Sequence, residues 1–450
     1  MKTSKYGFPV GATTVVTTTV VTVALALFAL VGQAQAGPQV SSSYGDQFTW
    51  VGAESAAMGG TGTAVYRGGF STAFNPAFLV VEDGKRLDAG VMLDQEHEDR
   101  FQPLFDSFDS WVIDAAIASN RQHYWQGGFG LAARVGHGPR AVSLGVSLTD
   151  RFPFGYSFSE ELRNPSPFPP GSGEPARDML IAVREREVTG ALRALSFGAA
   201  AEVSRNISLG TSFNYHFGTR RDASSSIDLD NAGTNESYRT SDELKLHGLN
   251  VTAGLRARLN ERVDLGVAVE SSLRATGDWR QQDVDLAPAA ATDTTVSAYY
   301  DYPWCARAGL AFRPRNDLRT VFTFEVEYRP WSEMRDGTLD DVTPILHDAA
   351  DIRLGVEHVF YNGMPLRFGF RHLSSYADRD AAVSAFTAGT AARVGQGRLS
   401  ASVELAKTTN VLAHQFPYPT AYFGDAFVAD PMARVEDTRF RVGVSYAMEF

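Results

Sequence analysis

The chain has 450 residues, a single cysteine and a formal net charge of −11 at pH 7. One cysteine excludes an internal disulfide and a cysteine-based metal site. The acidic balance argues against nucleic acid as a partner, because binding phosphates requires a basic surface.

The N-terminus has the pattern of a secretory signal peptide. Lys2 and Lys5 precede an uncharged stretch over residues 6–31, and Ala34-Gln35-Ala36 follows it. A basic start, an apolar core and a small-x-small site predict cleavage after Ala36, so residues 1–36 are the expected signal peptide. The stretch is also long enough to span a bilayer, and a retained anchor is the alternative.

Residues 37–85 are rich in glycine and alanine and do not alternate between apolar and polar positions. Glycines in Ala57-Met-Gly-Gly-Thr-Gly62 allow positive φ and close packing, and Asn75 before Pro76 favours a turn. No Lys-Ser or Lys-Thr follows, which argues against a phosphate-binding loop. We predict that this segment is a hatch inside a wide barrel, with a static filler as the alternative. Its key residues are Met58, Gly59, Gly60, Gly62, Phe74, Asn75 and Pro76.

Residues 86–450 alternate apolar and polar side chains, which is the pattern of strands with two different faces. No run of eighteen apolar residues occurs after Ala36, so a membrane-spanning form requires a closed β-barrel. The clearest alternating runs are 142–149, 207–217, 250–259, 263–269, 322–328, 352–356, 366–370, 399–405 and 440–450. Short and long connections take turns between the runs, as in bacterial outer-membrane barrels. The long ones are predicted over 153–189, 219–242, 278–298, 331–348, around 377–380 and over 409–437.

A first count gives fifteen strands, whereas bacterial single-chain barrels have an even number. Phe108, Trp111, Val112, Ala115 and Ala116 recur at helical spacing. We therefore interpret residues 111–119 as a short helix in the first outer loop. The fold prediction is all-β: a transmembrane antiparallel β-barrel of about fourteen strands with an N-terminal hatch in the lumen.

Aromatic residues cluster among prolines after the run at 142–149. Phe154, Tyr156, Phe158 and Phe168 are the candidate ligand-binding residues, because such a cluster in an outer loop offers an apolar ligand a collecting surface. The alternative is an aromatic girdle at the membrane interface, which we favour for Phe152 and Phe154.

Charged positions on the polar faces of the strands carry both signs. Such charges are expected to pair with one another and with the hatch, which favours a plugged barrel over an open porin. An arginine among them could hold a carboxylate headgroup. The nine histidines are scattered, so we predict no catalytic residues, no metal site, no cofactor and no enzymatic activity.

The last eight residues alternate Val444, Tyr446, Met448 and Phe450 with small or polar residues, and the chain stops on the phenylalanine. This ending is typical of an outer-membrane barrel strand. We therefore expect an outer-membrane location, contact with its lipid, and recognition of the strand ending in Phe450 by the barrel-assembly machinery.

The two N-terminal motifs, the barrel pattern and the terminal aromatic together resemble the FadL family of outer-membrane transporters. Phe78, where the family usually has glycine, and residues 66–69 depart from its pattern. The resemblance implies passive diffusion of hydrophobic small molecules, such as long-chain fatty acids or hydrocarbons, with exit past the hatch or through the wall. Alternatives are a PorV-like partner protein of a secretion system and a hydrophilic porin.

Overall fold

The computed structural model describes residues 42–46, 52–65, 68–81, 84–105, 110–136, 141–163, 180–229, 237–286, 289–314, 319–338, 344–416 and 432–450. The predicted signal peptide and Phe168 lie outside these ranges. No helix in the described ranges is long and apolar enough to cross a membrane.

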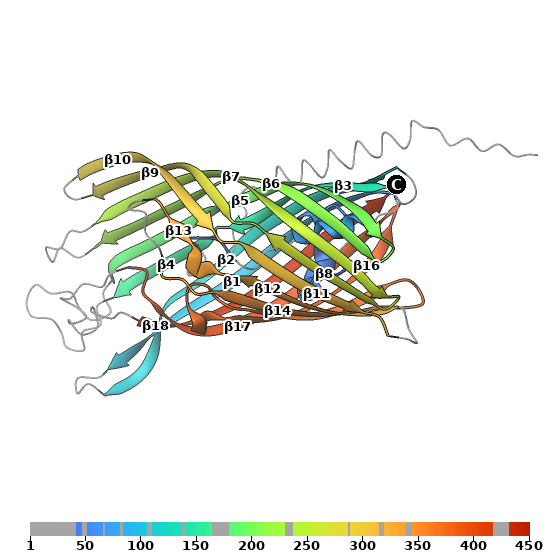
Figure 1. The fold of residues 1–450 in the computed structure, drawn as a ribbon. Helices are drawn as coiled ribbons and strands as arrows, with labels where there is room; N and C mark the ends of the chain where they lie inside the picture. The colour runs from blue at the N-terminus through green and yellow to red at the C-terminus, as the bar shows by residue number, and fades with distance from the viewer. Residues whose placement is uncertain are drawn as a thin grey trace, which may run out of the picture.

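Within these ranges, eighteen strands form one antiparallel sheet, and the sheet closes because β1 pairs with both β2 and β18 (Figure 1). The strands are β1 (Lys85–Phe105), β2 (Trp111–Val135), β3 (Val142–Pro153), β4 (Tyr156–Arg163), β5 (Leu180–Ser204), β6 (Ile207–Asp228), β7 (Tyr238–Asn260), β8 (Val263–Glu270), β9 (Leu273–Leu286), β10 (Ala289–Tyr302), β11 (Cys305–Phe312), β12 (Thr320–Arg329), β13 (Arg335–Asp336), β14 (Ala349–Val359), β15 (Pro365–Leu373), β16 (Val383–Val394), β17 (Gly397–Ala413) and β18 (Met432–Glu449). The short helices are α2 (Ala53–Ala56), α3 (Ser71–Phe74), η2 (Pro76–Val81), η4 (Trp331–Glu333) and η5 (Arg379–Ala381).

These strands make a barrel of fourteen wall strands, as predicted. Three wall strands are interrupted. The first consists of β3 and β4, which both pair with β5. The second consists of β8 and β9, which both pair with β7. The third consists of β10 and β11, of which β10 pairs with β9 and β11 pairs with β8. The two-residue β13 pairs with Tyr300 and Asp301, near the inner end of β10, and adds no wall strand.

The predicted helix over residues 111–119 is wrong. This segment is the outer part of β2, and it pairs with the outer part of β1. The register between the two strands shifts at Arg100/Phe101, so the partner of Phe101 is Ala116 and not Ile117. A second shift at Leu104/Phe105 leaves Val112 as an extra residue between Ile113 and Trp111. This bulge interrupts strict alternation within the stretch whose apolar positions imitate helical spacing. The count stays at fourteen because β2 is one strand.

The strands on one side of the barrel are much longer than predicted. β5, β6 and β7 have 25, 22 and 23 residues, whereas β12 and β15 have 10 and 9. Much of the predicted connections 219–242 and 278–298 is therefore strand. Above the bilayer neither face needs apolar residues, so the ladder of backbone hydrogen bonds continues where the hydrophobic pattern has already ended.

The alternating faces are confirmed by burial. On the membrane side, large apolar side chains are exposed, among them Leu144, Phe197, Phe213, Val251, Phe324, Leu354, Phe368, Leu405 and Phe440. Their polar neighbours are buried in the lumen, among them Ser143, Ser196, Ser212, Thr252, Thr323, Arg353, Arg367, Glu404 and Arg441. This arrangement gives the barrel an apolar outer belt and a polar interior.

Candidate functional site

The described part of residues 52–81 lies against the inner face of the barrel, and its helices are enclosed by the strands (Figure 1). Glu325 on β12 holds it directly. One carboxylate oxygen of Glu325 accepts hydrogen bonds from the backbone nitrogens of Gly62 and Thr63, both at 2.8 Å, and the other accepts from Arg353 at 3.0 Å. Glu325 is 1% exposed, so these charge-assisted bonds are shielded from water.

The Met58-Gly59-Gly60 turn packs on β15 and β16. Gly59 has a φ of +70°, and its backbone nitrogen donates to the Thr387 hydroxyl at 2.9 Å. That hydroxyl donates in turn to the Ala57 carbonyl at 3.0 Å. A β-carbon on Gly59 would lie 2.5 Å from the carbonyl oxygen of Phe370, so any side chain here would push the turn off the wall.

The side chain of Asn75 holds the second motif, residues 74–77, in place through hydrogen bonds to backbone groups, which agrees with the predicted turn. Its amide nitrogen donates to the carbonyls of Thr63 and Leu255, both at 3.0 Å, and its amide oxygen accepts from the Ala77 nitrogen at 3.1 Å. The Asn75 side chain thus joins Thr63, which follows the first motif, and Ala77, in the second motif, to Leu255 in β7. Phe78, the departure from the family pattern, lies under the guanidinium of Arg256 at 5.1 Å.

A ring of wall glycines forms the surface on which this segment lies, and the sequence analysis missed it. A β-carbon on Gly369 would lie 2.1 Å from the Gly59 nitrogen, and one on Gly266 would lie 2.0 Å from the Thr63 carbonyl oxygen. The same close approach recurs at Gly130, Gly145, Gly198, Gly210, Gly254, Gly355 and Gly389. The available signal was a glycine on the polar face in the middle of many alternating runs.

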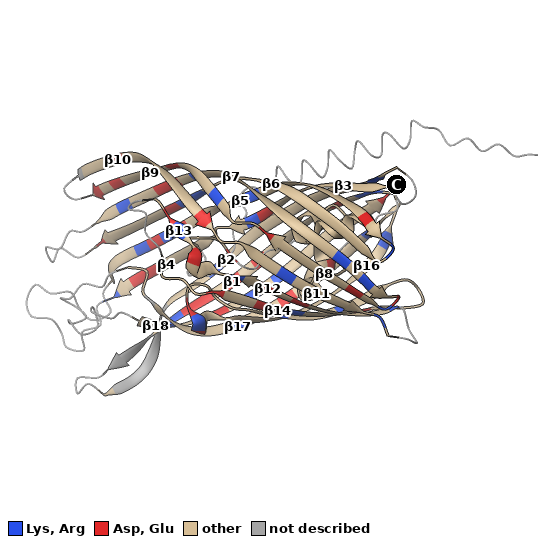
Figure 2. Cartoon of the chain, viewed as in Figure 1, with Lys and Arg blue, Asp and Glu red and all other residues tan. Residues whose placement is uncertain are grey.

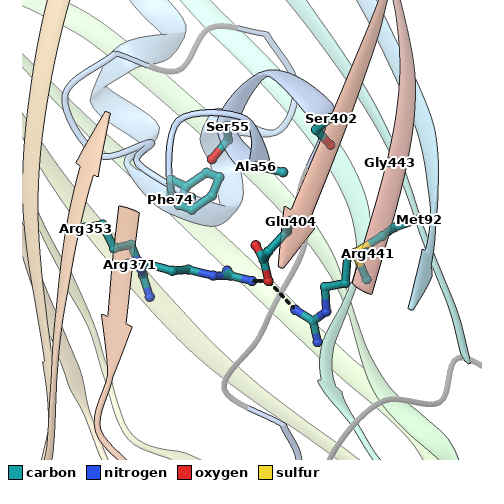
Figure 3. A pocket seen from close by; sticks show the side chains of 11 residues that line it. Ser55, Ala56, Phe74, Met92, Arg353, Arg371, Ser402, Glu404, Arg441 and Gly443 are labelled. Atoms are coloured by element: carbon teal, nitrogen blue, oxygen red, sulfur yellow. Dashed lines mark hydrogen bonds and ion pairs between the residues drawn. The ribbon is translucent and has the colours of Figure 1, made fainter. Parts of the chain in front are cut away.

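Lumen charges of both signs pair with one another, as predicted. Asp46, from the N-terminal segment, lies 3.3 Å from Arg439 and 3.2 Å from Arg441. Arg441 also lies 2.7 Å from Asp94 and 3.7 Å from Glu404. Figure 3 shows Glu404 between Arg371 and Arg441, with α2 and Phe74 beside them. The cavity among these side chains is only about 20 Å³, which is room for about one water molecule.

A second network fills the lumen beside β11 and β12. Glu270 lies 2.6 Å from Arg151 and 3.2 Å from Arg307. Glu327 lies 3.0 Å from Arg307 and 2.9 Å from Arg353. The two networks and the N-terminal segment together occupy the middle of the lumen.

On the outer side of these networks, aromatic side chains form a buried cluster. Phe152 stacks on Tyr302 with ring centroids 4.2 Å apart, and Trp331 stacks on Tyr376 at the same distance. Tyr156, Phe158 and Phe416 continue the cluster. Burial raises the pKa of the loop residue Tyr376 well above its ordinary value. Its neutral hydroxyl donates to the Gly45 carbonyl at 2.8 Å.

The interpretation of Phe152 and Phe154 as girdle residues is wrong. They are 4% and 0% exposed and face the cluster, not the membrane. A register shift between β3 and β5 at Asp150/Phe152 inserts Arg151 as an extra residue. This bulge reverses the alternation. The even-numbered positions point outward up to Leu148 and inward from Phe152 onward.

Of the four predicted ligand-binding residues, the structure brings Phe154, Tyr156 and Phe158 together in this cluster. They lie on or beside β4 inside the lumen, so they form a buried group and not the exposed loop surface that we predicted. The partners that the sequence analysis missed come from distant parts of the chain: Tyr300, Tyr302, Trp331, Tyr376 and Phe416.

The wall next to this cluster has an interruption. Within the described ranges, β2 pairs with β3 only from Gly128/Thr149 to Val135/Val142, and β4 pairs with β5 but not with β2. Side chains bridge the two edges: the Gly127 nitrogen donates to Asp150 at 3.2 Å, and the Ser159 nitrogen donates to Asn120 at 3.1 Å. Beside this interruption, the fully buried Gln126 amide has no hydrogen-bond partner in the part of the chain that the structure describes.

At the other end of the lumen, an open cavity of about 920 Å³ lies beneath the N-terminal segment. Five arginines and three glutamates line it: Arg86, Arg313, Arg367, Arg393, Arg398, Glu54, Glu357 and Glu449. Basic residues mark this end of the barrel in Figure 2.

Solved structures that resemble this fold include a FadL homologue and two toluene transporters. A Pseudomonas aeruginosa FadL homologue matches with a TM-score of 0.60 at 12% identity, covering 93% of this chain and 100% of that one. The P. putida toluene transporter TodX matches at 0.59 and 14%, covering 89% and 98%. The Ralstonia pickettii toluene transporter TbuX matches at 0.56 and 14%, covering 90% and 99%.

The chain is an outer-membrane β-barrel with the FadL-type fold. No protein-family profile matches the sequence, and no curated protein does either. At identities of 12–14%, the FadL-type likeness is a likeness of fold.

Proposed function

We propose that this protein is a passive diffusion channel that carries hydrophobic small molecules, such as hydrocarbons or long-chain fatty acids, into the outer membrane. The observation that carries the proposal is the buried aromatic cluster beside an interruption of the wall. An apolar ligand gains by leaving water for such a cluster. The names of TodX and TbuX describe toluene transport, which agrees with this ligand class.

Two tyrosine hydroxyls of the cluster already have partners, which supports an apolar ligand. The Tyr156 hydroxyl donates to Glu98 and accepts from Arg100, both at 3.0 Å. Tyr376 is bound to Gly45. The faces of the rings favour flat or flexible apolar molecules. The buried Tyr302 hydroxyl, which has no hydrogen-bond partner among the described residues, adds one polar group to this surface.

Residues 37–85 would act as the hatch in this mechanism. The charge networks and the hatch together fill the middle of the lumen, which argues against a hydrophilic porin. A ligand in the aromatic cluster would then leave sideways, between β2 and β4, into the lipid of the outer membrane. The barrel-assembly machinery remains a proposed partner, through the strand that ends at Phe450.

Uptake tests the function directly. Cells that lack the gene would receive it back as wild type, Phe158→Ala or Phe213→Ala, and uptake of labelled toluene and labelled oleate would be measured. Phe158 is buried in the cluster, whereas Phe213 is 48% exposed on the membrane face and serves as the matched control. We expect slower uptake only for the Phe158 variant and the empty strain. Equal rates with and without the gene would refute the proposal.

The sideways exit has its own test. Asp150 reaches the Gly127 nitrogen across the interruption, so Gly127→Cys with Asp150→Cys places two thiols at facing edges. Cys305, the native cysteine, is buried. Oxidation should slow uptake and a reductant should restore it. Unchanged uptake after verified disulfide formation would exclude this route.

A further inference from the structure

The open cavity beneath the hatch contains an arginine cluster that the proposed transport path does not use. Arg367, Arg393 and Arg398 come from the neighbouring strands β15, β16 and β17 and line the same cavity. Arg393 and Arg398 are directly opposite each other in the β16–β17 ladder. Like charges in such a pair repel each other. An anion bound between the two guanidinium groups would relieve this repulsion.

Glu54 in α2 shows that a carboxylate fits among these side chains. It lies 3.1 Å from Arg367, 3.5 Å from Arg86 and 4.0 Å from Arg398. It is the only carboxylate of the N-terminal segment among the residues that line this cavity.

The arginines still have hydrogen-bond donors available for an anion in addition to their contacts with Glu54. Arg367 is 2% exposed and donates to Glu54 and Glu357, yet its Nη1 atom has no hydrogen-bond partner among the described residues. Arg393 has no ion pair within the part of the chain that the structure describes, and Arg398 has only the 4.0 Å contact. A buried guanidinium nitrogen without an acceptor is costly, and an oxyanion at this point would satisfy it.

We propose that Arg367, Arg393 and Arg398 form a binding site for an oxyanion, a carboxylate or phosphate group that enters through the open end of the cavity. Arginine suits such a group because its nitrogens present paired donors. The cavity of about 920 Å³ is large enough for an organic anion as well as a small inorganic one. Glu54 competes with the anion for the same guanidinium groups.

The test uses the full-length protein in an uncharged detergent, titrated calorimetrically with inorganic phosphate and with octanoate. We expect saturable binding to the wild type. Arg393→Gln with Arg398→Gln should weaken it roughly tenfold or more, because two charged donors are lost from the open side of the site. Glu54→Gln should strengthen it, because it removes the competitor. Arg205→Gln, at an exposed turn that does not line the cavity, is the control.

Each outcome is informative. Binding of octanoate alone assigns the site to amphiphilic carboxylates, binding of phosphate alone to phosphate groups, and binding of both to oxyanions in general. No saturable binding of either probe, or equal affinity in the double variant, overturns the proposal. The result is independent of the transport proposal, because an uptake experiment without effect leaves this titration unchanged.

Discussion

Glu325 is predicted to hold the hatch to the wall. In Glu325→Ala, the Gly62 and Thr63 nitrogens and Arg353 each lose a carboxylate partner at 2.8, 2.8 and 3.0 Å. A hydrogen bond to a charged group contributes about 1.5–3 kcal/mol, and breaking a buried ion pair costs about 3–5 kcal/mol. The local stability of the hatch should therefore fall by about 3 kcal/mol or more.

Hydrogen exchange followed by mass spectrometry measures this loss. About 3 kcal/mol corresponds to roughly hundredfold faster exchange in peptides that cover the hatch around Gly62, because each 1.4 kcal/mol is a factor of ten. Peptides from β5 and β6 should keep their protection, because their ladder is untouched. Asp264→Asn is the matched control: Asp264 is a buried lumen carboxylate whose ion-pair partners are the wall residues Arg256, Arg258 and Arg313.

Two results would contradict the reasoning. Unchanged exchange around Gly62 in Glu325→Ala would mean that the carboxylate does not hold the hatch. Equally faster exchange in all strands would mean that Glu325 stabilises the whole barrel and not the hatch in particular.

Three further predictions concern the hatch and the wall. Thr387→Ala should raise exchange near Gly59, since one hydroxyl serves both the Gly59 nitrogen and the Ala57 carbonyl, whereas Thr387→Ser should not; equal effects would point to the methyl group. Gly369→Ala should raise ion conductance in planar bilayers by displacing Gly59. The control is Gly363→Ala, where φ is +81° and the space is open, so that the substitution should only strain its turn. An unchanged conductance of the Gly369 variant would contradict the close approach. Gln126→Leu should leave the free energy of unfolding unchanged or raise it by about 1 kcal/mol, because the buried amide has no hydrogen-bond partner within the described ranges; a clear destabilisation would reveal a partner.

The sequence by itself determined the class of fold and most of its plan. Alternation in runs such as 207–217 requires a sheet with one apolar and one polar face, and the absence of a long apolar run after Ala36 leaves a closed barrel as the form that spans a membrane. The glycines and Asn75 of the N-terminal segment indicated close packing and a turn, and the structure contains both.

Only the tertiary structure decided which residues meet. The bulge at Arg151 turned Phe152 and Phe154 from the membrane to the lumen, and the bulge in β2 made a strand resemble a helix. Gly62 and Glu325 are 263 residues apart in the chain, yet they share a hydrogen bond. Alternation reports the two faces of each strand but not the register between strands, and a shift of one residue exchanges the faces. The aromatic cluster, the interruption of the wall and the arginine site all depend on that register.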